Sequence, residues 1–207
     1  MTITRDFYQQ PTLEVAKALL GKKLVREINN KKYIGIIVET EAYIGENDTA
    51  CHAAKGRTQR TEVMFGAAGH AYIYFVYGMH YMFNIVTEAQ GHPSAVLIRA
   101  IEPLNQLELL KVNRKVGNIK LLTNGPAKLC QAYDINKQLN QWDLCIGKKL
   151  WLETSDKEAP RHIETSPRIG IDYAEEKDRH AHWRFTLKGN PFLSKKINPG
   201  HYATTKS

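Results

Sequence analysis

Two glutamates and a tyrosine stand out in the apolar segment I-V-E-T-E-A-Y at residues 37–43. Side chains two positions apart on a strand point to the same face, so Glu39, Glu41 and Tyr43 would share one side. Two carboxylates there are costly unless they are solvated or used. One interpretation is a general base, a carboxylate at the floor of a pocket that activates water. The other is structural: one glutamate pairs with an arginine such as Arg99, and the other faces solvent.

Aromatic residues are concentrated in Y-I-Y-F-V-Y-G-M-H-Y-M-F-N, residues 72–84. The alternation through Tyr72 and Tyr74 stops at Tyr77 and Gly78 and then resumes, which predicts a β-hairpin with Tyr77 at or near its tip. Tyrosine faces can stack on nucleic-acid bases, and a side chain at a hairpin tip can wedge between base steps. A half-buried strand pair with ordinary aromatic cross-strand contacts explains the same run equally well.

A histidine and two arginines lie in the polar, glycine-containing stretch 44–62, which predicts a long loop. His52 could stack on a base or lie at the surface. Arg57 and Arg60 could bind phosphates, or the threonines beside them, at positions 58 and 61, could cap the next turn.

Arg99 and Asn84 are polar residues within otherwise apolar segments. Arg99 needs a partner, which is either a buried acid or a phosphate from outside the protein. Asn84 would form a hydrogen bond inside a pocket or be a satisfied buried residue. A water-activating carboxylate, aromatic and imidazole faces, a wedge tyrosine and basic loops together match what an enzyme needs to act on a base extruded from duplex DNA.

The elements that must position these side chains include several strands joined by short turns. The segments K-L-V-R-E-I and Y-I-G-I-I-V-E-T-E-A-Y predict two strands with a tight turn at residues 29–30, and S-A-V-L-I-R-A-I-E predicts another strand. A helix capped by Thr12 and ended by Gly21 precedes them. Further predictions are helices at 103–112 and 126–133, a basic loop at 113–124, and strands at 149–153 and 183–188.

We therefore predict one mixed α/β (α+β) domain spanning residues 1–207, with a frayed tail after about residue 195. Its sheet would be curved and largely antiparallel, because the early strands are joined by short turns, and helices would flank it. The aromatic hairpin would protrude from this sheet.

Composition and charge narrow the class of protein. Hydrophobic residues make up 43% of the chain, enough for a full core, and no apolar stretch approaches the roughly 18 residues of a membrane span. The chain start lacks an export signal, and the three cysteines form no C-x-x-C pair, which predicts a reducing cytoplasm and no zinc site. The net charge of +8, mostly from the second half, fits a polyanionic partner or a soluble basic enzyme.

Long strings of the sequence resemble the alkyladenine (3-methyladenine) DNA glycosylases, in their compact bacterial form. The resemblance extends from about Phe7 to Ser194. The strings are I-V-E-T-E-A-Y (37–43), H-A-A-K-G-R-T-Q-R-T-E-V-M-F (52–65), G-H-A-Y-I-Y-F-V-Y-G-M-H-Y-M-F-N (69–84), V-L-I-R-A-I-E-P (96–103), N-G-P-A-K-L-C-Q-A (124–132), P-R-I-G-I-D-Y (167–173) and W-R-F-T-L-K-G-N-P-F (183–192).

The resemblance implies a monofunctional DNA glycosylase of base excision repair. Such an enzyme flips an alkylated or otherwise damaged purine out of duplex DNA and hydrolyses the N-glycosidic bond, leaving an abasic site. By this resemblance Glu41 is the general base, and Tyr43, His52 and Tyr74 stack around the flipped base. Other implied pocket residues are Tyr72 and Asn84, the latter disfavouring the exocyclic amine of guanine.

The resemblance also implies residues that contact DNA. Tyr77, with Gly78 and Met79 of the hairpin tip, would fill the gap left in the duplex. Arg99 would help to hold the flipped nucleotide and its phosphate. The remaining implied contacts to the backbone are Arg57, Arg60 and Lys128.

The expected partner is double-stranded DNA containing damaged purines, and the expected form is a monomer without metal or cofactor, associated with the bacterial nucleoid. Two other functions compete with this prediction. A non-catalytic DNA-binding module with an aromatic wedge explains the hairpin and the charge but not Glu41. A hydrolase of small nucleosides or glycosides would use Glu39 and Glu41, about 7 Å apart on one strand, as a carboxylate pair.

Overall fold

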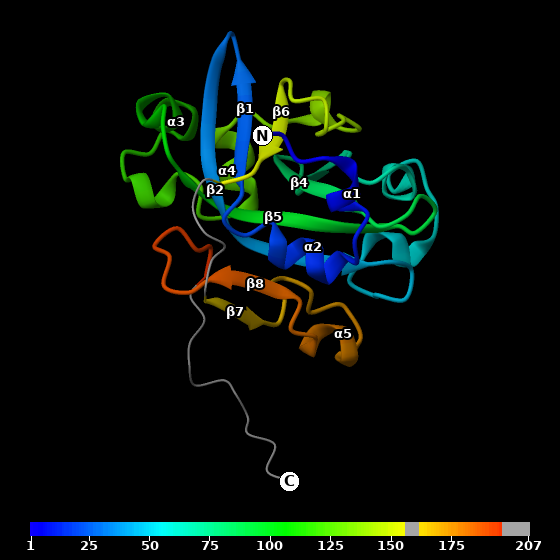
Figure 1. The fold of residues 1–207 in the computed structure, drawn as a ribbon. Helices are drawn as coiled ribbons and strands as arrows, with labels where there is room; N and C mark the ends of the chain where they lie inside the picture. Colours follow the sequence, from blue (N-terminus) through cyan, green and yellow to red (C-terminus); the bar gives the residue numbers. More distant parts are fainter. Residues whose placement is uncertain (156–161, 196–207) are drawn as a thin grey trace.

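The computed structural model describes residues 1–155 and 162–195, so the tail predicted after about residue 195 lies outside the described residues. Within these ranges, eight strands form one sheet (Figure 1). The strands are β1 (Lys23–Ile28), β2 (Lys31–Ile44), β3 (Ala71–Val76), β4 (His80–Thr87), β5 (Ser94–Pro103), β6 (Leu150–Glu153), β7 (Ile163–Ser166) and β8 (Arg184–Leu187).

The long strand β2 is the centre of this sheet. The strand order is β3-β4-β5-β2-β1-β6, and the paired strands are antiparallel. β2 pairs with β5 along one edge, while its other edge pairs first with β1 and then with β8, which β7 joins. The predicted mixed α/β domain with a largely antiparallel sheet is confirmed.

Short helices cover the sheet. In Figure 1, α2 lies against β2, and α4 packs on β4 and β5. The helices are α1 (Arg5–Tyr8), α2 (Thr12–Ala18), α3 (Leu107–Arg114), α4 (Pro126–Ala132) and α5 (Glu176–His180), and the 3-10 turns are His52–Lys55, Glu62–Phe65, Ile119–Leu121 and Lys137–Leu139. Among the described residues, no helix combines the length and the apolar character needed to cross a bilayer.

The structure corrects several details of the sequence prediction. Pro11, not Thr12, is the N-cap of α2, and the Thr12 hydroxyl instead lies 2.9 Å from that of Thr87. α3 begins at Leu107 rather than at residue 103, because β5 continues as far as Pro103. β7 and α5 were not predicted, since elements of four and five residues are too short to show a periodic pattern.

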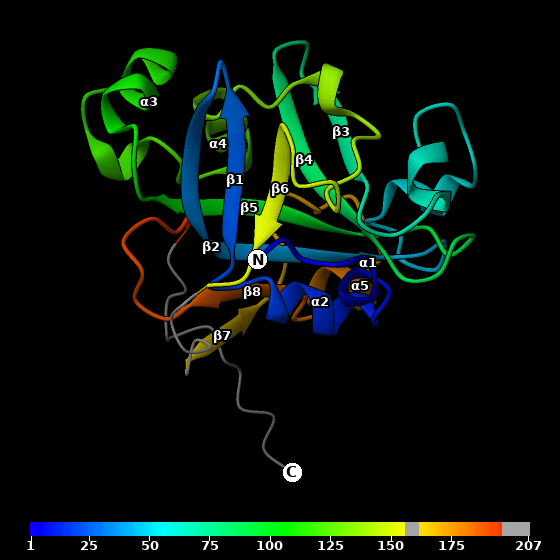
Figure 2. The ribbon, with the colours of Figure 1, turned by 45° about the horizontal axis from the view of Figure 1, so that its top comes forward.

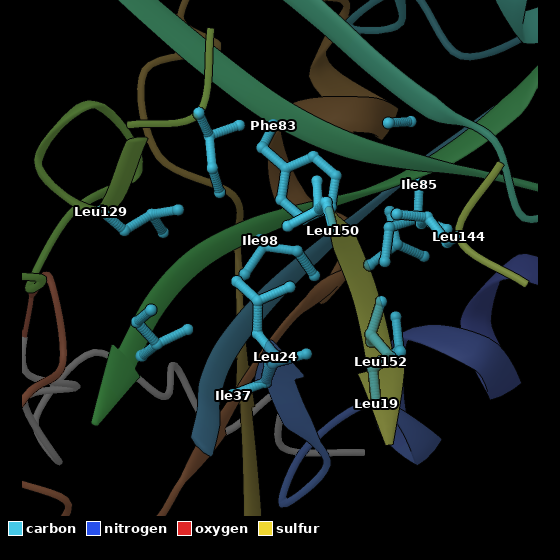
Figure 3. Close-up of a cluster of buried hydrophobic side chains, with 14 of the residues drawn as sticks. Leu19, Leu24, Ile37, Phe83, Ile85, Ile98, Leu129, Leu144, Leu150 and Leu152 are labelled. Atoms are coloured by element: carbon cyan, nitrogen blue, oxygen red, sulfur yellow. The ribbon is translucent and has the colours of Figure 1, made fainter. Parts of the chain in front are cut away.

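The main hydrophobic core lies between the sheet and the helices α2 and α4. Figure 3 shows Phe83 from β4 and Ile98 from β5 pointing toward Leu150 and Leu152 of β6, with Leu129 of α4 beside them. All five side chains are fully buried. This core holds β4 and β5 in place, and both strands also carry residues of the candidate site.

Tyr133, which directly follows α4, places its hydroxyl in this core without a hydrogen-bond partner among the described residues. A β-carbon on Gly35 would lie only 2.7 Å from this hydroxyl, so β2 needs a glycine here. Burial raises the pKa of Tyr133.

We expect Tyr133→Phe to raise the free energy of unfolding by about 1 kcal/mol, because a buried polar group without a partner costs about 1–3 kcal/mol. For a chain of this size, thermal denaturation should then show a rise in Tm of about 2–4 °C. A lower Tm for the variant would mean that the hydroxyl is bound in solution.

Candidate active site

Both glutamates of β2 are fully buried, so the structural interpretation in which one of them faces solvent is wrong. The register between β2 and β5 shifts on either side of Glu39. Arg99 of β5 lies between the two carboxylates: its Nε donates to Glu39 Oε1 at 3.0 Å and its Nη1 to Glu41 Oε2 at 3.1 Å. The sequence allowed Arg99 either a buried acid or an external phosphate as its partner, and in the structure the partners are the buried acids Glu39 and Glu41.

Three donors hold the Glu41 carboxylate. Besides Arg99, the Tyr43 hydroxyl donates to Oε2 at 2.9 Å, and the backbone N–H of Ile169 donates to Oε1 at 2.8 Å. Burial and the neighbouring Glu41 charge raise the pKa of Tyr43, so this hydroxyl keeps its proton and remains a donor. The carboxylate is thus fixed in one orientation.

A pocket of about 480 Å³ lies in front of this carboxylate. This volume falls within the range of about 300–1,000 Å³ that small-molecule sites occupy. Glu41 itself lies behind the lining, next to three lining residues that bind it. The predicted residues that line the pocket are Tyr43, His52, Arg60, Tyr72, Tyr74, Tyr77, Asn84 and Arg99.

His52 and Tyr74 form a wall of the pocket. Their ring centroids lie 4.5 Å apart in an edge-to-face arrangement, and the Arg60 guanidinium lies 5.0 Å above the Tyr74 ring. Arginine can only donate, so His52 Nε2 accepts from Arg60 at 3.4 Å. The other ring nitrogen, Nδ1–H, then donates to the Tyr72 hydroxyl at 2.9 Å. These contacts determine both the tautomer and the tilt of the imidazole.

His52 is neutral at physiological pH. Burial, with the charges of Arg60 and Lys55, lowers the pKa of His52 to about 4. The imidazole therefore presents an uncharged face to the pocket and adds no positive charge of its own opposite a cationic aromatic ring.

We expect an NMR titration to give a His52 midpoint near pH 4, and Arg60→Gln to raise it because a neighbouring positive charge is lost. A midpoint near 6.5 in the folded protein would contradict the buried environment. The unfolded histidine binds its proton more readily, so His52 contributes stability above about pH 6.5 that is lost as the pH falls toward 4.

Arg168 supports Tyr43 from behind the pocket. Its guanidinium lies 4.8 Å from the Tyr43 ring and 4.9 Å from the Trp183 ring, and it forms a two-point ion pair with Asp48 at 2.5 and 2.8 Å. Arg168 belongs to the P-R-I-G-I-D-Y string at residues 167–173, for whose residues the sequence predicted no role. The pocket-lining residues of this string that were missed are Ile169, Gly170, Ile171 and Tyr173.

The predicted hairpin is formed by β3 and β4, which project from the sheet in Figure 2. Its turn is closed by Met79 N–H donating to Val76 O at 3.1 Å. Tyr77 has a φ of +53° and Gly78 a φ of +66°, and the turn leaves 87% of Tyr77 and 67% of Met79 exposed. A non-glycine residue at positive φ is uncommon, so the tip holds Tyr77 outward at some backbone cost.

Of the remaining predicted residues, Asn84 lines the pocket, whereas Arg57 and Lys128 do not. Asn84 is both a pocket residue and satisfied, since its Nδ2 donates to Tyr72 O at 3.1 Å. Arg57 is exposed and pairs with Glu62 at 3.2 Å. Lys128 does not line the pocket, and its Nζ donates to Asn124 Oδ1 at 2.8 Å.

The turn around Arg57 and Arg60 is also closed by its threonines, because Thr61 N–H donates to Thr58 Oγ1 at 3.2 Å. The threonines thus close the turn, as one interpretation of the sequence has it. The arginines are exposed at the surface, where the other interpretation, phosphate binding, is also possible. Among the described residues, no group of three His, Cys, Asp or Glu side chains could hold a metal ion.

Comparison with known proteins bears out the resemblance noted in the sequence. Residues 6–191 match the model of the methylpurine-DNA glycosylase (MPG) family. A protein of Methanocella arvoryzae is 50% identical over 199 residues, covering 96% of this chain and 98% of its own. A protein of Clostridium acetobutylicum is 47% identical over 203 residues, covering 94% and 98%. Both relatives are described as candidate 3-methyladenine DNA glycosylases. This chain therefore belongs to the methylpurine-DNA glycosylase family.

Proposed function

We propose that this DNA glycosylase, a hydrolase of N-glycosyl bonds to alkylated bases, extrudes a nucleotide with a damaged purine from duplex DNA. Water activated by Glu41 then attacks the sugar C1′ and releases the purine. The observation that carries the proposal is the Glu41 carboxylate, fully buried and held by three donors directly behind an aromatic pocket. Burying a charge is costly, and a buried carboxylate held by the lining residues of a pocket is a candidate catalytic group.

In the proposed reaction, the bond between the deoxyribose C1′ and the purine nitrogen breaks, and its electron pair leaves with the base. The sugar gains positive charge, which the Glu41 carboxylate stabilises. Water attacks C1′, and Glu41 accepts the proton that the water loses. Among the described residues, no lysine lines the pocket, so we propose neither a Schiff base nor strand cleavage.

The pocket would select bases by their charge and shape. Tyr43 and Tyr74 offer π-faces that attract an electron-poor, cationic purine, and the neutral His52 adds a third face without opposing charge. The buried Asn84 lies at the pocket wall, where we propose that it disfavours the exocyclic amine of guanine. Alkylation at a ring nitrogen makes the purine cationic and also weakens its glycosidic bond.

The surface around the pocket would hold the duplex. We propose that Tyr77 enters the stack and replaces the extruded nucleotide, with Gly78 and Met79 against the groove. Arg57, Arg60 and Lys128 would contact the phosphates, and the net charge of +8 supports a polyanionic partner. We further propose that one copy of the chain acts at each lesion, on the DNA of the nucleoid.

Hydrolysis of small nucleosides by a carboxylate pair is less well supported. Glu39 does not line the pocket, and its carboxylate is occupied by donors from Arg99, Arg184 and Ser194. Neither glutamate belongs to the described lining, but three lining residues bind Glu41 and only one, Arg99, binds Glu39, so the pocket is not flanked by a carboxylate pair. A nucleoside would also make no use of the exposed Tyr77.

The proposal is tested by incubating the protein with duplex DNA treated with a methylating agent. We expect free methylated purines and alkali-sensitive abasic sites, with strands that remain intact until alkali is added. Undamaged duplex of the same sequence is the control. Strand breaks without alkali, or methylated nucleosides hydrolysed as fast as duplex DNA, would contradict the proposal.

A further inference from the structure

Glu39 is as deeply buried as Glu41, and the proposed reaction leaves it without a role. Four hydrogen bonds reach its carboxylate. Oε1 accepts from Arg99 Nε at 3.0 Å, from Arg184 Nε at 2.8 Å and from Ser194 Oγ at 2.6 Å, and Oε2 accepts from Ser194 N–H at 2.6 Å. Charge-assisted bonds in this number hold the carboxylate in a single orientation.

Arg99 is shared between Glu39 and Glu41. Because the guanidinium is planar, the bond from Nε to Glu39 sets the plane in which Nη1 reaches Glu41. The third nitrogen, Nη2, donates to Ser194 Oγ at 3.4 Å, so each of the three has a protein partner. The orientation of Arg99 toward Glu41 is therefore imposed from the Glu39 side.

Glu39, Glu41, Arg99 and Arg184 form a cluster of buried charges that sum to zero only when Arg184 is included. Glu39 and Glu41 supply two negative charges, and Arg99 and Arg184 two positive ones. The side chains of Arg99 and Arg184 are only 9% and 3% exposed, and neither carboxylate is exposed, so solvent screens these charges weakly.

We propose that Glu39 is a positioning residue for base excision. Its carboxylate orients Arg99 and offsets part of the positive charge of the guanidinium, so that Glu41 keeps the negative charge with which it accepts a proton from water. The inference rests on the proposed function of Glu41. If Arg99 paired with Glu41 alone, the guanidinium would offset the negative charge that attracts the proton of water and stabilises the sugar cation. Arg184 acts in the opposite sense, because it competes with Arg99 for Glu39.

Glu39→Gln should therefore slow base release. The amide keeps the volume of the side chain but removes the negative charge, and Arg99 then turns its full charge to Glu41. General-base catalysis contributes about 10²–10⁴-fold, so a partial loss should lower the single-turnover rate by about 10–100-fold. Affinity for lesion-containing duplex should stay within about threefold, since Glu39 lies behind the pocket.

Arg184→Gln should change the rate in the opposite direction. Without the positive charge of Arg184, Glu39 interacts more strongly with Arg99, and Arg99 offsets less of the negative charge of Glu41. We therefore expect base release to be faster than in the wild type. This opposite sign separates the proposal from a structural role, in which the loss of either partner would slow release together with a fall in Tm. Arg184→Gln also tests the proposal if Glu39→Gln does not fold.

The experiment measures single-turnover release of 3-methyladenine from a duplex, duplex affinity and Tm for both variants. Thr186→Val is the matched control, because Thr186 pairs with Glu39 across β2 and β8, and its buried hydroxyl has no partner among the described residues. Slower release by Glu39→Gln at unchanged affinity, with faster release by Arg184→Gln, supports the proposal. Wild-type rates in Glu39→Gln, or slower release by Arg184→Gln, would overturn it.

Glu41→Gln, measured in parallel, keeps the two proposals distinguishable. If the wild type releases base and Glu41→Gln does not, the role of Glu41 stands whatever the Glu39 variant does. If Glu41→Gln releases base at the wild-type rate, the proposed function itself fails, and the role of Glu39 fails with it.

Discussion

Replacement of Glu41 by glutamine should abolish base release while leaving binding to damaged duplex almost intact. The loss of a general base and of a charge that stabilises the transition state should lower the single-turnover rate by at least about 10²–10⁴-fold. Because Glu41 lies behind the pocket lining, its amide would not change the surface that a flipped base meets. The expected pattern is thus an unchanged dissociation constant and an almost undetectable rate.

The measurement compares release of 3-methyladenine and gel-shift binding on the same lesion-containing duplex. Glu108→Gln serves as the control, since it makes the same chemical change at an exposed pair with Lys111 on α3. Binding without release by the wild type as well would favour the non-catalytic DNA-binding module. Equal loss of binding and release in Glu41→Gln would mean that the buried carboxylate supports the fold rather than the reaction.

Local patterns were sufficient to predict the elements that carry most of the site. The alternation of tyrosines through residues 72–84 predicted the β3–β4 hairpin, and the apolar runs at 33–43 and 94–102 predicted β2 and β5. Because alternate side chains of a strand point to the same face, Tyr72 and Tyr74 were correctly predicted to lie side by side.

The environment of the carboxylates could not be predicted in the same way. The partners that make full burial possible, Arg184 and Ser194, come from 145 and 155 residues further along the chain. A buried charge depends on such distant partners, and a single sequence does not reveal them.

The lining residues Ile169, Gly170, Ile171 and Tyr173 were missed for a related reason. Their segment has no periodic pattern, and its contribution to Glu41 is the backbone N–H of Ile169, which every residue type except proline could supply. The support that Arg168 gives to Tyr43 depends on Tyr43, Trp183 and Asp48 meeting around it, which is a property of the tertiary fold.

Tyr77→Ala should weaken binding to damaged duplex strongly and leave the fold unchanged. The side chain is 87% exposed, so its removal costs the folded protein little packing. In the complex the ring would replace the stacking of the extruded nucleotide, and stacking of an aromatic side chain on a base is worth about 1–3 kcal/mol. The dissociation constant should rise by about 5–150-fold, with an unchanged Tm.

The sharpest form of this test compares duplex and single-stranded DNA that carry the same lesion. A single strand leaves no gap in a base-pair stack, so Tyr77→Ala should bind it almost as the wild type does. Tyr77→Phe keeps the ring and the strained turn, and we expect it to bind duplex almost normally. Equal losses on both substrates would instead make Tyr77 a general contact surface, because a wedge acts only where there is a stack to enter.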